Sequence, residues 1–298
     1  MITHTICPLC SSGNISPFLK CTDHLLSREE FDLSKCTECG FVFTLKYPDE
    51  QNIGKYYKSD DYISHDDSAK GFLSLIYLQI RSLMLKKKRS IIKKTTGLTK
   101  GRILDIGCGT GYFAATMKKE GWDVTGIEPN VKARDFATRH FALNVISPEH
   151  ISELQSGIFD CITLWHVLEH FHDPFSYASE IKRLLKPDGV CLCALPNCSS
   201  SDASHYDEYW AAYDVPRHLW HFTPETFGLF TEKTGFHITE TKSLPLDVFY
   251  ISILSEKNKG SKFSFLTGMI KGTSFAFRSL FNKSKNSSLI YFLSKVSD

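Results

Sequence analysis

The chain has 298 residues, of which 42% are hydrophobic and 23% are charged, and its formal net charge is +2 at pH 7. This length suits one large domain or a large domain with a small one, and the composition is ordinary for a globular protein. The small net charge gives no support to a nucleic-acid partner. No apolar run of about 18 residues predicts a membrane-spanning helix. The N-terminus lacks the pattern of a secretory signal, so the sequence predicts a cytoplasmic protein.

Residues 1–46 carry two cysteine pairs, Cys7 with Cys10 and Cys36 with Cys39. Each pair places two thiolates on one tight turn, and two such turns can close a tetrahedral zinc site. A segment this short buries little core, so metal binding would supply its folding energy. The spacing predicts a small N-terminal zinc ribbon with a structural ion. The alternative is two chance pairs of buried cysteines.

Residues 47–98 are predicted to form a lid and a helical linker. The first part, 47–70, is polar and aromatic, whereas apolar residues between Gly71 and about Lys94 recur at helical spacing. Tyr62 and His65 are candidate substrate contacts, because an N-terminal segment of this kind can fold over a site and exclude water. The basic run 86–89 is interpreted as a solvated helix face.

From Gly101 onward, short apolar runs alternate with amphipathic segments. This alternation is typical of a parallel sheet with helices on both faces. We therefore expect an α/β fold over residues 99–298, with a doubly wound, mostly parallel, seven-stranded sheet. The last apolar run, 289–296, would pair antiparallel with 236–243 after an insertion at about 245–286. The other predicted strands are 102–106, 123–128, 144–147, 159–165 and 190–195, and the predicted helices are 111–120, 131–141 and 174–186.

The loop after the first of these strands carries glycine at positions 107, 109 and 111. Glycines let the backbone turn tightly and approach a ligand, and ligands of doubly wound sheets bind at the carboxyl ends of the strands. Asp105 lies two residues before the loop, where a carboxylate suits a cationic amine better than an anionic pyrophosphate. Glu128 ends the second strand, where it can take both ribose hydroxyls. The pattern favours S-adenosylmethionine over NAD, whose sites use G-x-G-x-x-G.

Several segments together resemble the class I S-adenosylmethionine-dependent methyltransferases. Residues 103–113, 126–129, 159–170 and 184–189 are similar to the motifs of that family, although Asp188 stands where glycine is commoner. Residues between Pro196 and Phe222 resemble a bacterial branch with an N-terminal four-cysteine zinc ribbon, found among polysaccharide and small-molecule methyltransferases. The resemblance implies methyl transfer to an oxygen or carbon of a small-molecule or sugar acceptor, in surface-glycan synthesis. The implied cofactor residues are Asp105, Gly107, Cys108, Gly109, Gly111, Glu128, Pro129 and Trp165.

Acceptor chemistry is expected from histidines at the same edge of the sheet, because histidine titrates near neutral pH and can act as a general base. The candidate catalytic residues are His166, His170, His218 and His221. Trp210 and Arg217, in the loop 210–222, are candidate substrate contacts. The alternative for this loop is an internal network of hydrogen bonds and stacked rings. The whole domain could also bind a ligand without turnover, as an adaptor.

Between Lys257 and Ser297 the sequence contains eight basic residues and no acidic one, interleaved with aromatic and aliphatic residues. A basic amphipathic segment fits peripheral contact with the inner membrane face, through about 262–285. It also fits a dimer contact or a cover over a hydrophobic substrate. The sequence slightly favours these two alternatives, taken together, over the membrane contact. The oligomeric state stays open.

Overall fold

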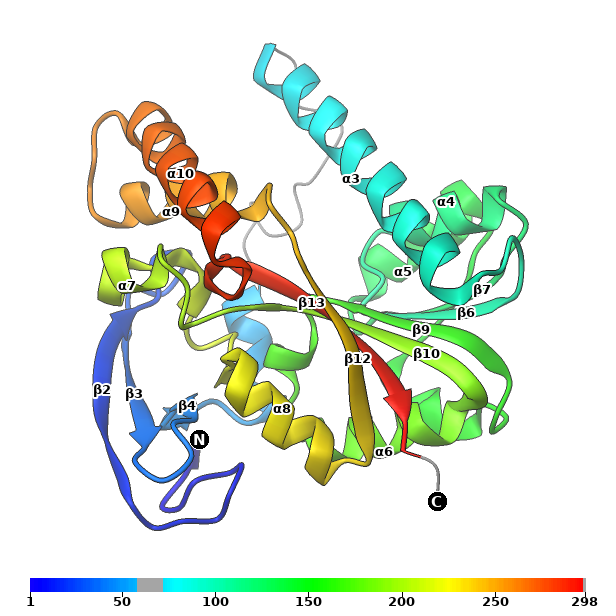
Figure 1. The fold of residues 1–298 in the computed structure, drawn as a ribbon, viewed down its shortest axis with the longest axis horizontal. Coiled ribbons are helices and arrows are strands. Elements are labelled where there is room, and N and C mark those ends of the chain that lie inside the picture. Colours follow the sequence, from blue (N-terminus) through cyan, green and yellow to red (C-terminus); the bar gives the residue numbers. More distant parts are fainter. Residues whose placement is uncertain (58–71, 297–298) are drawn as a thin grey trace.

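A computed structural model of the chain describes residues 1–57 and 72–296. Its centre is a seven-stranded sheet with the order β12-β13-β10-β9-β6-β7-β8, which crosses the middle of Figure 1. All neighbouring strands from β10 to β8 pair in parallel, whereas β13 lies antiparallel between β10 and β12. The strands are β6 (Arg102–Ile106), β7 (Asp123–Ile127), β8 (Asn144–Ile146), β9 (Phe159–Trp165), β10 (Leu185–Pro196), β12 (Phe236–Ser243) and β13 (Ser288–Lys295).

Helices cover both faces of this sheet (Figure 1). Contacts join α3 to β9, β10 and α4 on one face, and they join α6 to β10 and α8 to β12 on the other. Local signals set several helix starts, since Asn130, Asp173 and Thr223 each cap a first turn with the side chain. The helices are α3 (Phe72–Thr96), α4 (Tyr112–Lys119), α5 (Val131–Phe141), α6 (Pro174–Leu184), α8 (Pro224–Lys233), α9 (Asp247–Asn258) and α10 (Ser264–Phe281). Shorter elements are α1 (Glu50–Ile53), α7 (Ala203–Tyr206) and single 3-10 turns.

The apolar strand residues divide between two hydrophobic cores, because successive side chains point to opposite faces. Ile103 and Cys161 pack with α3, α4 and α5, whereas Leu104 and Ile162 pack with α6, α8 and the N-terminal ribbon. Burial on both faces explains why these strands read as continuous apolar runs.

The predicted fold class is confirmed, including the antiparallel pairing of 289–296 with 236–243. Several details differ from the prediction or extend it. β10 begins at Leu185 instead of Val190, with a register shift between these residues. The sequence also predicts a helix that begins at Glu169 and His170, whereas these residues belong to a single 3-10 turn. The insertion forms the helical hairpin α9–α10, and the basic run 86–89 is not uniformly solvated.

The N-terminal ribbon shares a second sheet with the α/β domain. This sheet has the order β11-β4-β3-β2, and β11 (Trp220–His221) comes from the predicted acceptor loop. The other strands are β2 (Ile15–Thr22), β3 (Glu30–Cys36) and β4 (Val42–Thr44), and a separate pair joins β1 (Ile2–Thr3) to β5 (Lys46–Tyr47). The ribbon therefore continues into the larger domain in space, although residue 46 divides them in sequence. Among the described helices, none has the length and apolar character needed to cross a bilayer.

Candidate cofactor and acceptor site

The glycine loop between β6 and α4 lies where the strand order reverses, between β6 and β9. Ligands of doubly wound sheets bind at this point. Gly107, Gly109 and Gly111 all adopt positive φ, at 71°, 54° and 83°, which non-glycine residues rarely do. A Cβ at Gly107 would also collide with Val167, and one at Gly111 with Ala137 and Leu143. The loop therefore requires glycine at these positions.

Two buried carboxylates flank the loop. Asp105 accepts a hydrogen bond of 2.7 Å from the Thr163 hydroxyl, and burial raises its pKa to about 7. Glu128 accepts from the backbone N–H groups of Gly109 and Asn130, both at 2.9 Å, and burial raises its pKa as well. Desolvated carboxylates of this kind are stabilised by a cationic ligand. The residues present therefore fit S-adenosylmethionine, which carries a cationic sulfur and a cationic amine.

The remaining predicted cofactor residues surround the same loop. Cys108 packs against Gly126, where an added Cβ would lie 2.7 Å from the Cys108 sulfur. Pro129 follows Glu128 and is exposed. Trp165 ends β9, and its buried indole N–H has no hydrogen-bond partner among the described residues. An unpaired buried donor beside the loop is consistent with a ligand position.

Lys88 is a site residue that the sequence analysis missed, because the run 86–89 was interpreted as a solvated face. Its ammonium lies 4.2 Å from the centre of the Trp165 ring. Burial lowers the pKa of Lys88, while the nearby Asp105 and Asp247 oppose this shift. The helical spacing does indicate that Lys88 points inward, because it lies four residues after Met84 and three before Ile91, and both of these pack in the core beneath α3.

His166 directly follows β9 and adopts a left-handed backbone, with φ of 60°. Its Nε2 lies 3.1 Å from Asp247 and its Nδ1 lies 3.7 Å from Glu169. Burial lowers the pKa of His166, but the two carboxylates outweigh burial and raise it to about 9. Asp247, from the start of the insertion, was also missed. His166 therefore lies between Asp247 and Glu169 and forms an ion pair with each.

His170 and His218 lie together, with ring centres 4.5 Å apart. The Nδ1 of His170 lies 3.1 Å from the carbonyl of Arg217 and 3.0 Å from the Tyr57 hydroxyl. The Nδ1 of His218 lies 2.8 Å from the carbonyl of Ala212. Burial and the neighbouring His218 lower the pKa of His170 to about 4. These contacts bring His166, His170 and His218 into one group around Glu169.

His221 does not join this group. It is 4% exposed, lies in β11, and its Nε2 is 3.3 Å from the Thr44 hydroxyl of the ribbon. The imidazole ring contacts Thr44 across the sheet that the ribbon shares with the α/β domain. This geometry favours a structural role for His221 over the expected catalytic one.

Trp210 and Arg217 are also internal rather than facing a substrate. The Trp210 indole donates to Asp202 at 2.7 Å. The Arg217 guanidinium, 1% exposed, pairs with Asp23 at 2.9 Å and with Asp214 at 2.6 Å, and it donates to the Tyr56 carbonyl at 3.0 Å. Arg217 therefore joins the loop 210–222 to the ribbon through Asp23 and to the start of the predicted lid segment through Tyr56. Tyr62 and His65 lie outside the described residues.

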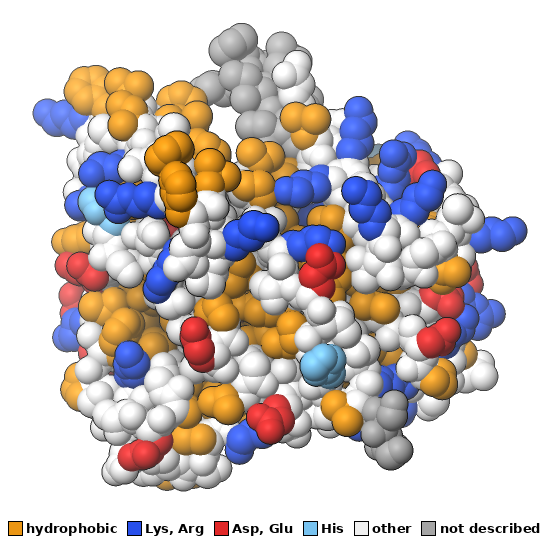
Figure 2. All heavy atoms as spheres, in the orientation of Figure 1, with side chains coloured by type: hydrophobic (Ala, Val, Ile, Leu, Met, Phe, Trp, Pro, Cys, Tyr) orange, Lys and Arg blue, Asp and Glu red, His pale blue; other side chains and the backbone are white. Residues whose placement is uncertain are grey.

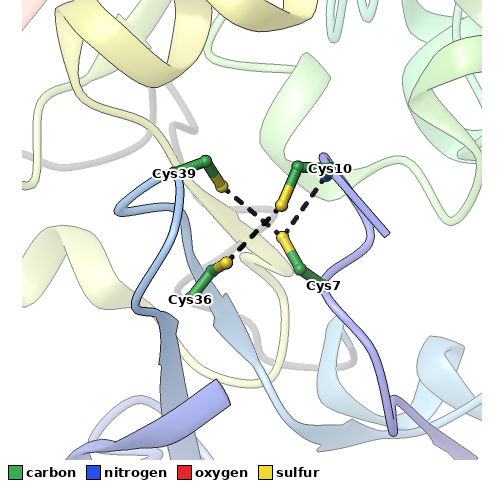
Figure 3. A group of neighbouring side chains, drawn as sticks. All are labelled: Cys7, Cys10, Cys36 and Cys39. Carbon is green, nitrogen blue, oxygen red and sulfur yellow. Dashed lines mark hydrogen bonds between the residues drawn. The ribbon is translucent and has the colours of Figure 1, made fainter. Parts of the chain in front are cut away.

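The four ribbon cysteines point toward one another (Figure 3). The sulfurs of Cys7 and Cys39 lie 3.6 Å apart, and those of Cys10 and Cys36 lie 3.5 Å apart. A tetrahedral zinc ion with Zn–S bonds of about 2.3 Å places its sulfurs about 3.8 Å apart. The four thiolates fit a structural zinc ion and leave no open position for catalysis.

The sheet order, the glycine loop and the buried acidic pair define the class I S-adenosylmethionine-dependent methyltransferase fold. A family model described as "Methyltransferase domain" matches residues 79–241, more than half of the chain. The chain therefore belongs to the methyltransferase-domain family.

Curated relatives agree over this region. The ubiquinone biosynthesis O-methyltransferase of Pectobacterium atrosepticum is 32% identical over 106 residues, covering 33% of this chain and 44% of that protein. The enzyme of the same name from Histophilus somni is 34% identical over 129 residues, covering 40% and 54%. The chain spans about half the length of these relatives. The fold is similar to that of Haemonchus contortus phosphoethanolamine N-methyltransferase 2, with a TM-score of 0.54 at 16% identity, covering 91% of this chain and 70% of the other.

Proposed function

We propose that this protein transfers a methyl group from S-adenosylmethionine to a hydroxyl oxygen of a small-molecule acceptor. The observation that carries the proposal is the desolvated pair Asp105 and Glu128 around a loop with three left-handed glycines. The O-methyltransferase names of the relatives support oxygen as the accepting atom. The cofactor supplies a methyl group on a cationic sulfur, which an oxygen nucleophile can displace in line.

The residues of this chain would contribute mainly position and charge. Orientation of two reactants can supply on the order of 7–11 kcal/mol of the barrier. Asp105, Glu128 and Trp165 would hold the donor, whereas His166 and His170 would stand at the acceptor side. The pKa of His166 is raised to about 9, so its imidazole would be a cation at neutral pH that stabilises the oxygen anion of the acceptor. Lys88 of α3 and Asp247 of α9 connect the donor side with the acceptor side. Asp247 contacts His166, and Lys88 interacts electrostatically with both Asp105 and Asp247.

For the acceptor, we propose a sugar or lipid-linked intermediate of surface-glycan synthesis, in keeping with the branch with a four-cysteine ribbon that the sequence resembles. In this proposal the zinc ion is structural, because four thiolates saturate a tetrahedral site. The competing functions are a ligand-binding adaptor without turnover and an NAD-dependent oxidoreductase, and the missing G-x-G-x-x-G spacing disfavours the latter.

Calorimetry with S-adenosylmethionine and with NAD tests the cofactor. We expect S-adenosylmethionine alone to bind, and binding of NAD alone would overturn the proposal. A methyl-transfer screen with nucleotide sugars, lipid-linked glycans and polyprenyl phenols then tests turnover. Cofactor binding with no transfer to any acceptor in that screen would favour the adaptor.

We also propose that α10 places the protein on an anionic membrane surface. The buried side of this helix is small, because Gly268 and Gly272 allow close packing against Ile253 and Phe249 of α9. The opposite side carries exposed apolar residues, and Figure 2 shows hydrophobic side chains gathered over this corner beside Lys and Arg side chains. Exposed members are Phe263, Phe265, Leu266, Met269, Ile270, Phe277, Leu280 and Phe281.

From the sequence, a dimer contact and a cover over a hydrophobic substrate were together slightly favoured over a membrane surface. Charge favours the lipid surface over the dimer contact. Lys262, Arg278, Lys283 and Lys285 flank the apolar side and are exposed, and no acidic residue occurs from 257 to 297. A symmetric contact would set these cations against their own copies, whereas each basic residue gains about 1 kcal/mol near anionic lipid. The hairpin begins at Asp247, which contacts His166, so a bound membrane would lie near the acceptor side.

Flotation with vesicles tests this surface. The full chain should bind phosphatidylglycerol vesicles, and the double variant Leu266→Ser/Phe277→Ser should lose most of that binding. Leu83→Ser/Val131→Ser is the matched control, because both residues are 59% exposed elsewhere on the molecule. Equal binding by both double variants, or self-association in place of vesicle binding, would overturn the proposal.

A further inference from the structure

A second cluster of metal-binding side chains lies apart from the four cysteines, at the acceptor side of the site. One carboxylate oxygen of Glu169 and one nitrogen of each of His170 and His218 lie within 4.8 Å of one another. Glu169 and His170 come from the turn after β9, and His218 comes from the acceptor loop. Two distant segments thus deliver two imidazoles and a carboxylate to one point.

Both imidazoles are held as metal ligands usually are. The Nδ1 of His170 faces the carbonyl of Arg217 at 3.1 Å, and the Nδ1 of His218 faces the carbonyl of Ala212 at 2.8 Å. A carbonyl only accepts, so an Nδ1 that bonds to one carries the proton and leaves the lone pair on Nε2. The Tyr57 hydroxyl oxygen, 3.0 Å from the Nδ1 of His170, can accept from the same N–H. A ligating histidine typically donates its other N–H in this way, which fixes the tautomer and the ring orientation.

Glu169 supplies the independent observation that points to a ligand. Its side chain is 1% exposed, and neither carboxylate oxygen has a hydrogen-bond partner among the described residues. The Nδ1 of His166 lies 3.7 Å from Glu169, which is within ion-pair distance but beyond normal hydrogen-bond distance. An ionised carboxylate without donors is costly to bury, so buried charges are usually paired or bound to a metal.

We propose that Glu169, His170 and His218 bind a divalent first-row transition ion, such as Zn2+, Co2+ or Mn2+. Imidazole ligands favour these ions over Mg2+ and Ca2+, which prefer all-oxygen sites. Three protein ligands leave at least one position open, as catalytic metal sites require.

The role of the ion rests on the proposed methyl transfer, whereas its binding does not. A hydroxyl acceptor bound at the open position would lose its proton more readily, because a divalent cation stabilises the oxygen anion. The acceptor O–H bond would break with its proton passing to solvent. The oxygen would form the new bond to the methyl carbon while the carbon–sulfur bond of the donor breaks and its electron pair stays on sulfur. The ion would also select acceptors with a hydroxyl or a pair of adjacent oxygens.

Metal counting on the full chain tests the site. Protein depleted of metal and reloaded with Zn2+ should hold about two equivalents, one in the four thiolates and one in the new site. Glu169→Gln and His218→Ala should each hold about one. His237→Ala, which removes an exposed histidine on β12, should retain both.

A second measurement does not depend on the folding of any variant. Wild-type protein with zinc in its ribbon should bind about one equivalent of Mn2+ in an electron paramagnetic resonance titration, because thiolates disfavour this ion. Excess Mg2+ should not displace it.

One zinc equivalent in the wild type, or two in both site variants, would overturn the site. So would the absence of Mn2+ binding by the wild type. Calorimetry with S-adenosylmethionine on the same samples separates the two proposals. Cofactor binding by protein that takes up no second ion contradicts the metal site alone, whereas ion binding without cofactor binding contradicts the proposed methyl transfer alone.

Discussion

At the scale of single residues, the fold places carboxylates in the interior and leaves them to be neutralised by a ligand. The Thr163 hydroxyl and the charge of Lys88 stabilise the ionised form of Asp105, but burial outweighs them and raises its pKa to about 7. Arg217 shows the opposite case, because the Asp23 and Asp214 carboxylates satisfy its buried guanidinium fully. The composition of the loop 210–222 predicted that Arg217 contacts a substrate, but this residue forms internal ion pairs instead. At the cofactor side, Asp105 and Glu128 are left for a ligand to neutralise.

The raised pKa of Asp105 predicts a pH dependence of cofactor binding. The cationic amine of S-adenosylmethionine requires the ionised carboxylate, so binding should release a proton. Affinity should rise by up to about tenfold per pH unit between about pH 5.5 and 7 and then level off. Calorimetry across this range measures it. Asp105→Asn should bind weakly and without the slope, whereas the exposed control Asp123→Asn should retain the slope. A slope that persists in Asp105→Asn would assign the proton to another group.

Arg217 gives a second prediction at this scale. Arg217→Met leaves the buried Asp23 and the half-buried Asp214 without their partner, and breaking a buried ion pair from one side costs about 3–5 kcal/mol. Urea unfolding measures the loss. Lys20→Met, which breaks an exposed pair with Glu30, should change the free energy of unfolding by less than about 1 kcal/mol. Wild-type stability in Arg217→Met, with weakened acceptor binding, would restore the substrate role predicted from sequence.

At the scale of elements, the hairpin α9–α10 shows helix packing that depends on small residues. A Cβ at Gly268 would lie 2.5 Å from the Ile253 Cα, so backbone meets backbone there. Among described elements, α9 is the main neighbour of α10, and the large side chains of α10 turn outward. The close packing and the exposed apolar side are thus two consequences of one residue pattern.

Gly268→Leu should therefore separate the two helices. Overpacking of this kind costs about 1–3 kcal/mol, offset in part by the better helix propensity of leucine. Thermal unfolding should show a lower midpoint for Gly268→Leu than for Thr273→Leu, which adds the same side chain at an exposed position of α10. Equal midpoints would mean that α10 does not pack on α9 in solution.

At the scale of the molecule, the ribbon and the methyltransferase domain stabilise one another through the sheet that β4 and β11 share. Phe41 and Phe43 of the ribbon pack in the same core as Trp220 and Phe222. The loop 210–222 is thus joined through β11 to a strand of the ribbon that carries the four cysteines. This connection gives the ribbon a role in positioning His218, which lies two residues before β11.

If the four cysteines hold the proposed zinc ion, its removal should loosen the loop 210–222 and spare the strands beside the glycine loop. Hydrogen exchange after chelation should accelerate at Thr44 and Cys198, whose N–H groups bond to the Leu219 and Phe222 carbonyls. The amides of β6 and β7 should retain their protection, because their partners lie within the large sheet. Uniform acceleration across both regions would instead indicate global unfolding.

The strands and helices, the glycine loop and the cysteine pairs could be predicted from the sequence, because each depends on residues that are close together in the chain. The strands alternate with helices at the correct residues, the three glycines occupy positions that demand positive φ, and the CxxC spacing alone brings thiolates together in pairs. Helix periodicity also contained the inward position of Lys88, although the charge of the run suggested solvent.

The tertiary structure decided the features that depend on partners far away in the sequence. The pairing of β11 with the ribbon, the burial of Arg217 against Asp23, and the contact of Asp247 with His166 join residues separated by 81 to 194 positions. Composition and spacing carry no information about such neighbours. The histidines show the same difference between sequence and structure. The sequence predicted that all of them lie at one edge of the sheet. Only the fold shows that His170 and His218 lie together beside Glu169 and that His221 is buried in β11.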